Sequence, residues 1–281
     1  MTNMREGSVL CLDPKGWHRM RYAEWGDPHN PRVLVCAHGL TRNGRDFDYL
    51  ARAMSDAYRV VCPDVVGRGR SDWLKDPADY TYAVYNNDMA TLIASLHAET
   101  LDWVGTSMGG IIGMILASLP GSPIRKLVMN DVGSVIPKAS LDRIGQYVGR
   151  EPSFDTFDEL MAAMRSVSPF GELTDEQWRH LTVNVAKQDE RGKWTFRYDP
   201  GIAQNFHATV TGDIDLRAFW NAVHGPALVI RGEQSDLLLD STLREMSQRA
   251  HTQAYVVPNC GHAPMLMDDA QVGVIRRFLL G

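Results

Sequence analysis

One serine of this 281-residue chain stands in a setting that suits covalent catalysis. Ser107 is the central residue of a G-x-S-x-G pattern at 105–109. An apolar run at 101–104 precedes the pattern and an apolar stretch at 111–119 follows it, so it lies between a predicted buried strand and a predicted helix. A turn this tight needs glycines beside the serine, and it presents the hydroxyl at a helix N-terminus, where developing negative charge is stabilised. The pattern therefore predicts a nucleophilic serine.

A nucleophilic serine needs a base, and His262 is the histidine best placed to serve. It ends the sequence Asn-Cys-Gly-His at 259–262, just after the predicted strand at 254–257. Loops that leave the carboxyl edge of a parallel sheet are where ligand chemistry collects. His38 follows the predicted strand at 32–36 and is expected to tie its loop together through a ring N–H. The other seven of the nine histidines are expected to have surface or packing roles: His18, His29, His97, His180, His207, His224 and His251.

The acid that orients the histidine has two main candidates. Asp236 follows the predicted strand at 227–230 and lies between the serine and the histidine, as the chain order of serine, acid and histidine requires. Asp131 follows the strand at 125–129, and a carboxylate there reaches the same histidine from a neighbouring strand end. The sequence favours Asp236 as the acid, with Asp131 as the alternative and Glu233 as a weaker third candidate.

The loop after the first buried strand supplies one side of the expected oxyanion hole. The sequence His-Gly-Leu-Thr at 38–41 opens the loop that leads to the predicted helix at 47–54. The backbone N–H groups of Leu40 and Met108 are the predicted donors, because the second donor comes from this loop. Arg42 lies just beyond and is a candidate contact for a substrate carboxylate; a solvated loop arginine is the alternative.

The elements that must position these residues alternate between strands and helices. Short, nearly continuous apolar runs predict strands covered on both faces, and they recur at 32–36, 58–62, 101–104, 125–129, 227–230 and 254–257. Apolar stripes at helical spacing lie between them at 47–54 and 85–96. This alternation predicts an α/β fold with a mostly parallel, doubly wound sheet. The segments 8–13 and 17–26 alternate in polarity and predict an antiparallel edge.

The alternation is interrupted once, between Gly133 and about Leu216. No clear buried strand appears there, whereas 155–165 and 174–187 have helical patterns. The interruption is too long for a plain loop and predicts a helical cap. The chain is therefore divided into a first core part at 1–133, a cap insertion at 134–216 and a second core part at 217–281. Cap aromatic residues that either line a pocket or pack in a core are Phe154, Phe157, Phe170, Trp178 and Phe206.

Composition excludes several classes of function. Hydrophobic residues make up 44% and charged residues 22%, as in globular and not in disordered or fibrous proteins. The net charge is −5 without a dense basic run, so no nucleic-acid partner is expected. The four cysteines form no C-x-x-C pair, which argues against a disulfide framework and a zinc cage and suits a reducing cytosol. The uncharged stretch 103–124 is interrupted by glycines and prolines, so no membrane partner is expected. Together with the cysteine pattern, this predicts a cytoplasmic protein.

Together these residues resemble the α/β-hydrolase superfamily, in particular its cap-bearing branch of serine esterases and lactonases. The resemblance covers nearly the whole chain, and its motifs fall in the family's order: His-Gly at 38–39, the glycine-rich stretch 64–71, the elbow at 105–109, Gly-Glu-x-x-Asp at 232–236 and Gly-His at 261–262. It implies that the cap roofs the substrate pocket. Members with an aspartate nucleophile, the haloalkane dehalogenases and epoxide hydrolases, are disfavoured because a serine stands at the nucleophile position.

The activity that the resemblance implies is hydrolysis of a small carboxylic ester or lactone through an acyl-enzyme. Similar triads also hydrolyse C–C bonds or amides, or transfer acyl groups and make peracids, and these are the alternatives within enzymes. A ligand-binding receptor with little turnover is the alternative outside them. No cofactor or metal is expected, since neither G-x-G-x-x-G after a strand nor H-E-x-x-H occurs. The expected partner is the ester or lactone itself, and the sequence does not indicate an oligomeric state.

Overall fold

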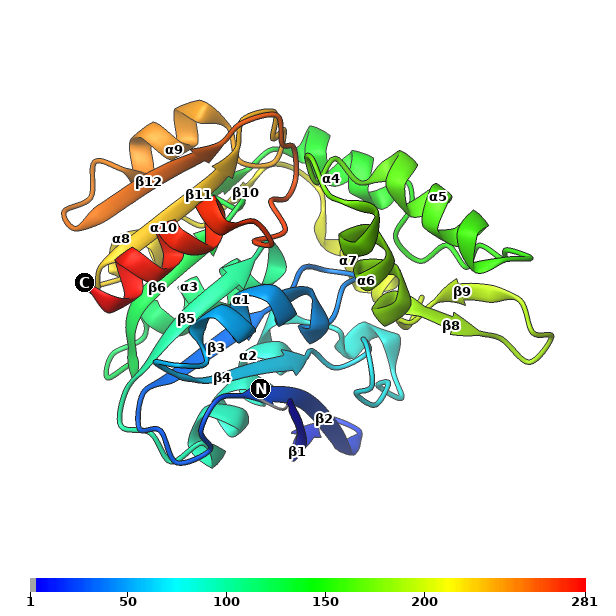
Figure 1. Cartoon of the computed structure of the whole chain (residues 1–281), viewed down its shortest axis with the longest axis horizontal. Coiled ribbons are helices and arrows are strands. Elements are labelled where there is room, and N and C mark those ends of the chain that lie inside the picture. Colours follow the sequence, from blue (N-terminus) through cyan, green and yellow to red (C-terminus); the bar gives the residue numbers. More distant parts are fainter. Residues whose placement is uncertain (1–3) are drawn as a thin grey trace.

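The computed structural model describes residues 4–281, and one large sheet lies at its centre (Figure 1). Among these residues the sheet has eight strands, in the order β1-β2-β4-β3-β5-β6-β11-β12. The strands from β4 to β12 run parallel, whereas β2 pairs antiparallel with both β1 and β4. The predicted parallel sheet and its antiparallel edge are thus confirmed. The strand bounds are β1 (Arg5–Asp13), β2 (Gly16–Trp25), β3 (Val33–Ala37), β4 (Arg59–Asp64), β5 (Leu101–Thr106), β6 (Ile124–Asn130), β11 (Ala227–Gly232) and β12 (Thr252–Val257).

Both faces of the sheet are apolar because successive side chains of its central strands point alternately into two hydrophobic cores. In β3, Leu34 and Cys36 face one core, and Val33 and Val35 face the other. A strand covered on both faces has no polar side, which explains the continuous apolar runs of the sequence. The first core is covered by two helices that lie in front of the sheet in Figure 1, α1 (Asp48–Met54) and α10 (Asp269–Leu280). The second is covered by α2 (Tyr82–Ser95), α3 (Met108–Ser118), α8 (Arg217–Ala222) and α9 (Asp240–Met246).

The order of the strands creates a topological switch point between β3 and β5. From β3 the chain moves to β4 on one side and then returns as β5 on the other side. The loops that follow β3 and β5 therefore diverge, and the crevice between such loops is where open α/β sheets bind ligands. The uncharged stretch 103–124 is divided among β5, α3 and the start of β6, as predicted. None of the helices within residues 4–281 is both long and apolar enough to cross a membrane.

The insertion between β6 and β11 projects from one side of the sheet (Figure 1). Besides the expected helices it has two short antiparallel pairs, β7 with β10 and β8 with β9. The first pair joins the start of the insertion to its end and so closes it back toward the sheet. Capping boxes that begin at Thr156 and Thr174 define the starts of α5 and α6. The elements are β7 (Val135–Ile136), α4 (Lys138–Gly145), α5 (Phe157–Val167), α6 (Asp175–Val185), β8 (Ala186–Gln188), β9 (Trp194–Phe196), α7 (Ile202–Thr209) and β10 (Ile214–Asp215).

Candidate active site

A strained turn between β5 and α3 presents Ser107 at the switch point. Its φ of 52° and ψ of −116° are a left-handed conformation that residues with a Cβ rarely adopt. The Ser107 N–H donates to the Asn130 carbonyl oxygen at the end of β6, at 2.9 Å. The Ser107 carbonyl oxygen accepts from the amides of Gly110 and Ile111 in the first turn of α3. A neighbouring strand and a helix thus hold the strained residue in place.

The glycines of the G-x-S-x-G pattern are required because backbone atoms pack against them. A Cβ on Gly105 would lie 2.2 Å from the Gly109 carbonyl oxygen. A Cβ on Gly109 would lie 2.0 Å from the carbonyl oxygen of Ala37, the last residue of β3. The Gly109 N–H also donates to the His38 carbonyl oxygen at 3.1 Å. The turn that carries the serine is therefore packed directly against the loop that follows β3.

Ser107, His262 and Asp131 form one hydrogen-bonded line. The Ser107 Oγ lies 3.0 Å from His262 Nε2, and His262 Nδ1 lies 2.8 Å from Asp131 Oδ2. Asp131 is fully buried, and it also accepts from the Gly232 amide at 2.8 Å and from the Ser235 hydroxyl at 2.7 Å. These donors compensate for the burial of the carboxylate and fix its direction. The His262 side chain is 12% exposed, so its ring borders the space above the serine.

The prediction that Asp236 contacts His262 is wrong, and the alternative residue Asp131 has that position. Asp236 accepts two hydrogen bonds from Arg143 of α4, at 2.7 and 2.8 Å, and its side chain is 47% exposed. Burial would raise the pKa of Asp236, but the hydrogen bond and charge of Arg143 outweigh this effect and hold it below its usual value. Glu233, the third candidate, accepts from the Asn259 amide at 3.0 Å. The end of β6, and not the loop after β11, therefore supplies the carboxylate that meets the imidazole.

The two predicted oxyanion donors lie close to the serine and have free N–H groups. Met108 is the first residue of α3, and a Cβ at Gly39, next to Leu40, would be 3.7 Å from the Ser107 Cβ. Within residues 4–281, no backbone hydrogen bond engages the N–H of either Leu40 or Met108. Both groups are available to bind a negatively charged oxygen.

The loop that carries Leu40 is held by a buried arginine that sequence reasoning did not single out. Arg68 is completely buried, and its Nε donates to the Leu40 carbonyl oxygen at 2.7 Å. Its Nη1 donates to the Val66 carbonyl oxygen and the Tyr85 hydroxyl, at 2.8 and 3.0 Å. Among the described residues, no carboxylate forms an ion pair with it. The one signal in the sequence is its place in the glycine-rich stretch 64–71.

His38 is part of the same support and does not take part in the Ser107 line. Its Nδ1–H donates to the Gly39 carbonyl oxygen at 2.7 Å, and its Nε2 accepts from the Val65 amide at 2.9 Å. Complete burial lowers the pKa of His38 to about 3, so the ring is neutral. The ring therefore ties the loop after β3 to the loop after β4, as its sequence position predicts.

A cavity of about 290 Å³ lies between the cap and the Ser107–His262 pair. Five aromatic side chains contribute to its wall, all from the insertion: Tyr147, Phe154, Phe170, Phe196 and Tyr198. Of the cap aromatic residues named from the sequence, Phe154 and Phe170 line this space, whereas Phe157, Trp178 and Phe206 do not. A second, more open hollow of about 430 Å³ adjoins it and shares Arg143, the segment 167–169 and His262.

Three arginines line the cavity, and they differ in whether a carboxylate neutralises them. Arg42, the predicted substrate contact, donates to both oxygens of Asp46, at 2.6 and 2.8 Å. Arg143 is paired with Asp236 as described above. The exposed Arg150 has no carboxylate within ion-pair distance among residues 4–281. Arg150, and not Arg42, is therefore the cavity arginine with an uncompensated charge.

The chain matches the family model for the alpha/beta hydrolase fold over residues 32–269. A 3-hydroxybutyrate-oligomer hydrolase of Cupriavidus necator is 50% identical, over an alignment that covers 99% of this chain and 98% of that protein. The esterase YbfF of Escherichia coli is 25% identical over 89% of this chain and 94% of its own length. Among solved structures, an alpha/beta hydrolase from Novosphingobium aromaticivorans is 33% identical and superimposes with a TM-score of 0.90, covering 100% of this chain and 99% of that one.

The packing of Gly109 predicts a strong and local sensitivity to a single methyl group. Substitution Gly109→Ala is expected to destabilise the fold by about 3 kcal/mol, because the added Cβ overlaps the Ala37 carbonyl oxygen and backbone cannot move aside cheaply. The matched control is Gly212→Ala, since no atom lies within 4 Å of a Cβ there. Urea unfolding of both variants measures the difference; equal stabilities would contradict the close packing of the turn.

Proposed function

The chain belongs to the α/β-hydrolase family, and we propose that it hydrolyses the ester bonds of short 3-hydroxybutyrate oligomers, with Ser107 as nucleophile, His262 as general base and Asp131 as the acid that orients it. The observation that carries this proposal is the continuous line of hydrogen bonds from Ser107 through His262 to the buried Asp131. Such a line is the arrangement that activates a serine for acyl transfer.

The general class of reaction follows from the relatives. The chain is a carboxylic ester hydrolase, as its sequence predicts, since its relatives include an oligomer hydrolase at 50% identity and an esterase that matches along most of its length. The specific substrate is inferred from the first of these, because it matches this chain from end to end.

The first half of the proposed reaction forms an acyl-enzyme. Ser107 Oγ attacks the ester carbonyl carbon while its proton moves to His262 Nε2, and the charge on the imidazolium is stabilised by Asp131 through Nδ1–H. The carbonyl oxygen becomes negatively charged and accepts hydrogen bonds from the free N–H groups of Leu40 and Met108. The tetrahedral intermediate then collapses, and the departing 3-hydroxyl oxygen of the next unit takes the proton from Nε2.

The second half releases the acid and restores the serine. A water molecule gives a proton to His262 Nε2 and attacks the acyl carbonyl carbon, and the same two N–H groups bind the oxygen. When the intermediate collapses, Ser107 Oγ leaves and takes the proton back from the imidazolium. Arg68 assists both halves, because a buried positive charge near the two N–H groups stabilises a negatively charged oxygen. Its Nε binds the Leu40 carbonyl oxygen, and its Nη2 lies 3.6 Å from the Met108 sulfur.

The shape and charge of the cavity support a short, linear and acidic substrate. Its volume of about 290 Å³ is near the lower end of the range for small-molecule sites, roughly 300–1,000 Å³. His262 borders both the cavity and the adjoining hollow, so a linear oligomer that passes His262 can place one end in each of them. A compact lactone would not need the second space. A 3-hydroxybutyrate oligomer has one free carboxylate, and Arg150 is the cavity charge available to bind it.

Rapid mixing with p-nitrophenyl butyrate and with the 3-hydroxybutyrate trimer tests this proposal. We expect a burst of about one equivalent of p-nitrophenol, followed by steady turnover, and release of 3-hydroxybutyrate from the trimer. The variant Ser107→Ala should lose both reactions while remaining folded. Turnover of the p-nitrophenyl ester without cleavage of the trimer would contradict the proposed substrate but not the proposed mechanism of ester hydrolysis. A wild-type protein inert toward both would overturn the mechanism as well.

The two aspartates should differ sharply in their effect on catalysis. We expect Asp131→Asn to lower kcat by about 10³- to 10⁴-fold, because the amide no longer holds the productive imidazole tautomer. The matched variant Asp236→Asn should change kcat by about fivefold at most, since it removes only a partly exposed ion pair. Steady-state kinetics with p-nitrophenyl butyrate measures both. A larger loss in Asp236→Asn would assign the acid to the loop after β11.

Arg150 should discriminate acidic from neutral substrates. We expect Arg150→Gln to raise KM for the trimer by about tenfold or more, the value of a lost hydrogen bond between charged groups, and to leave KM for p-nitrophenyl butyrate unchanged. The control is Arg191→Gln, which removes an exposed arginine that does not line the cavity. Equal changes for the acidic and the neutral ester would show that Arg150 does not bind the carboxylate.

A further inference from the structure

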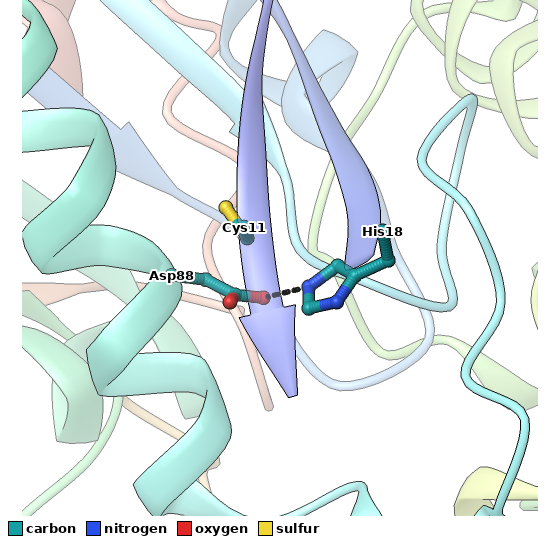
Figure 2. Close-up of side chains that lie close together, drawn as sticks. All are labelled: Cys11, His18 and Asp88. Atoms are coloured by element: carbon teal, nitrogen blue, oxygen red, sulfur yellow. Dashed lines mark hydrogen bonds and ion pairs between the residues drawn. The ribbon is translucent and has the colours of Figure 1, made fainter. Parts of the chain in front are cut away.

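A buried cluster of three different metal-ligand types lies in the β1–β2 hairpin and the helix beside it. Cys11 of β1 and His18 of β2 are directly opposite each other in the antiparallel register, and Asp88 comes from α2. Figure 2 shows the three side chains close together between the hairpin and the helix, with the Asp88 carboxylate directed at the His18 ring. Their exposed fractions are 1%, 4% and 0%. None of the three lines the catalytic cavity.

We propose that Cys11, His18 and Asp88 form a binding site for one Zn²⁺ ion that ties the edge hairpin to α2. The thiol sulfur, imidazole nitrogen and carboxylate oxygen all lie within 4.8 Å of one another. Bonds from zinc to nitrogen, oxygen and sulfur are about 2.0–2.3 Å long, so the three side chains need to move together only slightly for one ion to contact all of them. Thiolate, imidazole and carboxylate are also the three side-chain ligands that Zn²⁺ takes in proteins.

A second and independent observation is an unsatisfied carboxylate oxygen. Asp88 Oδ2 lies 2.8 Å from His18 Nε2, whereas the buried Oδ1 receives no hydrogen bond of good geometry, and the weakly donating Cys11 thiol is the other group that interacts with this carboxylate. A buried carboxylate oxygen without a partner costs free energy that a bound cation would recover. With Zn²⁺ bound, the ion replaces the proton between Nε2 and Oδ2, and the free oxygen is available as a further ligand.

The remaining nitrogen of His18 is already held as in known zinc sites. His18 Nδ1 lies 2.9 Å from Asp13 Oδ2, and the Asp13 side chain is itself 5% exposed. Histidines that bind metals with one nitrogen usually donate the other N–H to a carboxylate, which sets the tautomer and direction of the ring. Asp13 therefore orients His18 so that Nε2 faces Cys11 and Asp88.

Charge and proton balance are consistent with a divalent ion. On binding, the Cys11 thiol loses its proton and His18 loses the proton on Nε2, so the ion meets a thiolate, a neutral imidazole and a carboxylate. The two negative ligands then match the 2+ charge. Burial and the nearby Asp88 carboxylate raise the pKa of Cys11 to about 12, so the thiol keeps its proton until the metal displaces it. Sequence reasoning found no metal pattern because two of the ligands meet across a hairpin and the third comes from a distant helix.

Cobalt substitution of the full chain, freed of metal by a chelator, tests the site directly. We expect one equivalent of Co²⁺ to bind with a thiolate-to-cobalt charge-transfer absorption, and Zn²⁺ to abolish it by displacement. The absorption should be absent in Cys11→Ala and present in the matched variant Cys260→Ala, which removes another cysteine that is 1% exposed and lies next to the triad. Absence of the band in the wild type, or its loss in Cys260→Ala alone, would overturn the proposal.

The orienting residue gives a second test that keeps all three ligands. We expect Asp13→Asn to raise the Kd for Zn²⁺ by about 10- to 100-fold, the usual effect of changing a partner of a ligating histidine. Far-UV circular dichroism confirms that each variant is folded. Unchanged Zn²⁺ affinity in Asp13→Asn would show that Asp13 does not orient a zinc ligand. Zn²⁺ binding that survives Cys11→Ala in the folded protein would place the ion at another site, and either result would overturn the proposal.

Discussion

The contact between the start of α3 and the end of β3 is the constraint on which the active site depends. At Gly109 the helix backbone comes so close to Ala37 that no side chain fits between them. This closeness forces the chain through the left-handed conformation at Ser107 and places the first N–H groups of α3 beside the loop of Leu40. The proposed nucleophile and the proposed oxyanion donors are therefore positioned by the same packing contact. The strain at Ser107 is balanced by hydrogen bonds to β6 and within α3.

The two aspartates near His262 differ in burial, and they also differ in the residue that they bind. Asp131 is fully buried and interacts with three groups, the Gly232 amide, the Ser235 hydroxyl and the His262 imidazole, which together fix the direction of its carboxylate. Asp236 stays partly exposed and binds Arg143 of the cap instead. That ion pair joins the insertion to the loop after β11 at the boundary of both hollows. The carboxylate that the sequence assigns to the histidine thus connects the insertion to the sheet instead.

The sequence predicts those features that depend on neighbouring residues and misses those that depend on distant ones. The strands, the turn at Ser107 and the position of His262 are encoded in short local patterns, and the fold bears out the strands and the turn. The choice between Asp131 and Asp236 was not readable, because it depends on which of two adjacent strand ends faces the ring. Arg68 was missed for a similar reason, since two of its partners, Leu40 and Tyr85, come from the loop after β3 and from α2. Local pattern alone does not contain such contacts.

Because the chain is negatively charged overall, binding of the proposed acidic substrate depends on where individual arginines lie. With a net charge of −5, the molecule as a whole repels an anion at long range. Attraction must therefore come from groups near the serine whose charge is not cancelled by a carboxylate. Arg42 and Arg143 are cancelled by Asp46 and Asp236, whereas Arg150 is not. Salt screens long-range repulsion more strongly than a contact in a cavity, so recognition of the free carboxylate of the proposed substrate would depend on the cavity wall and not on the surface.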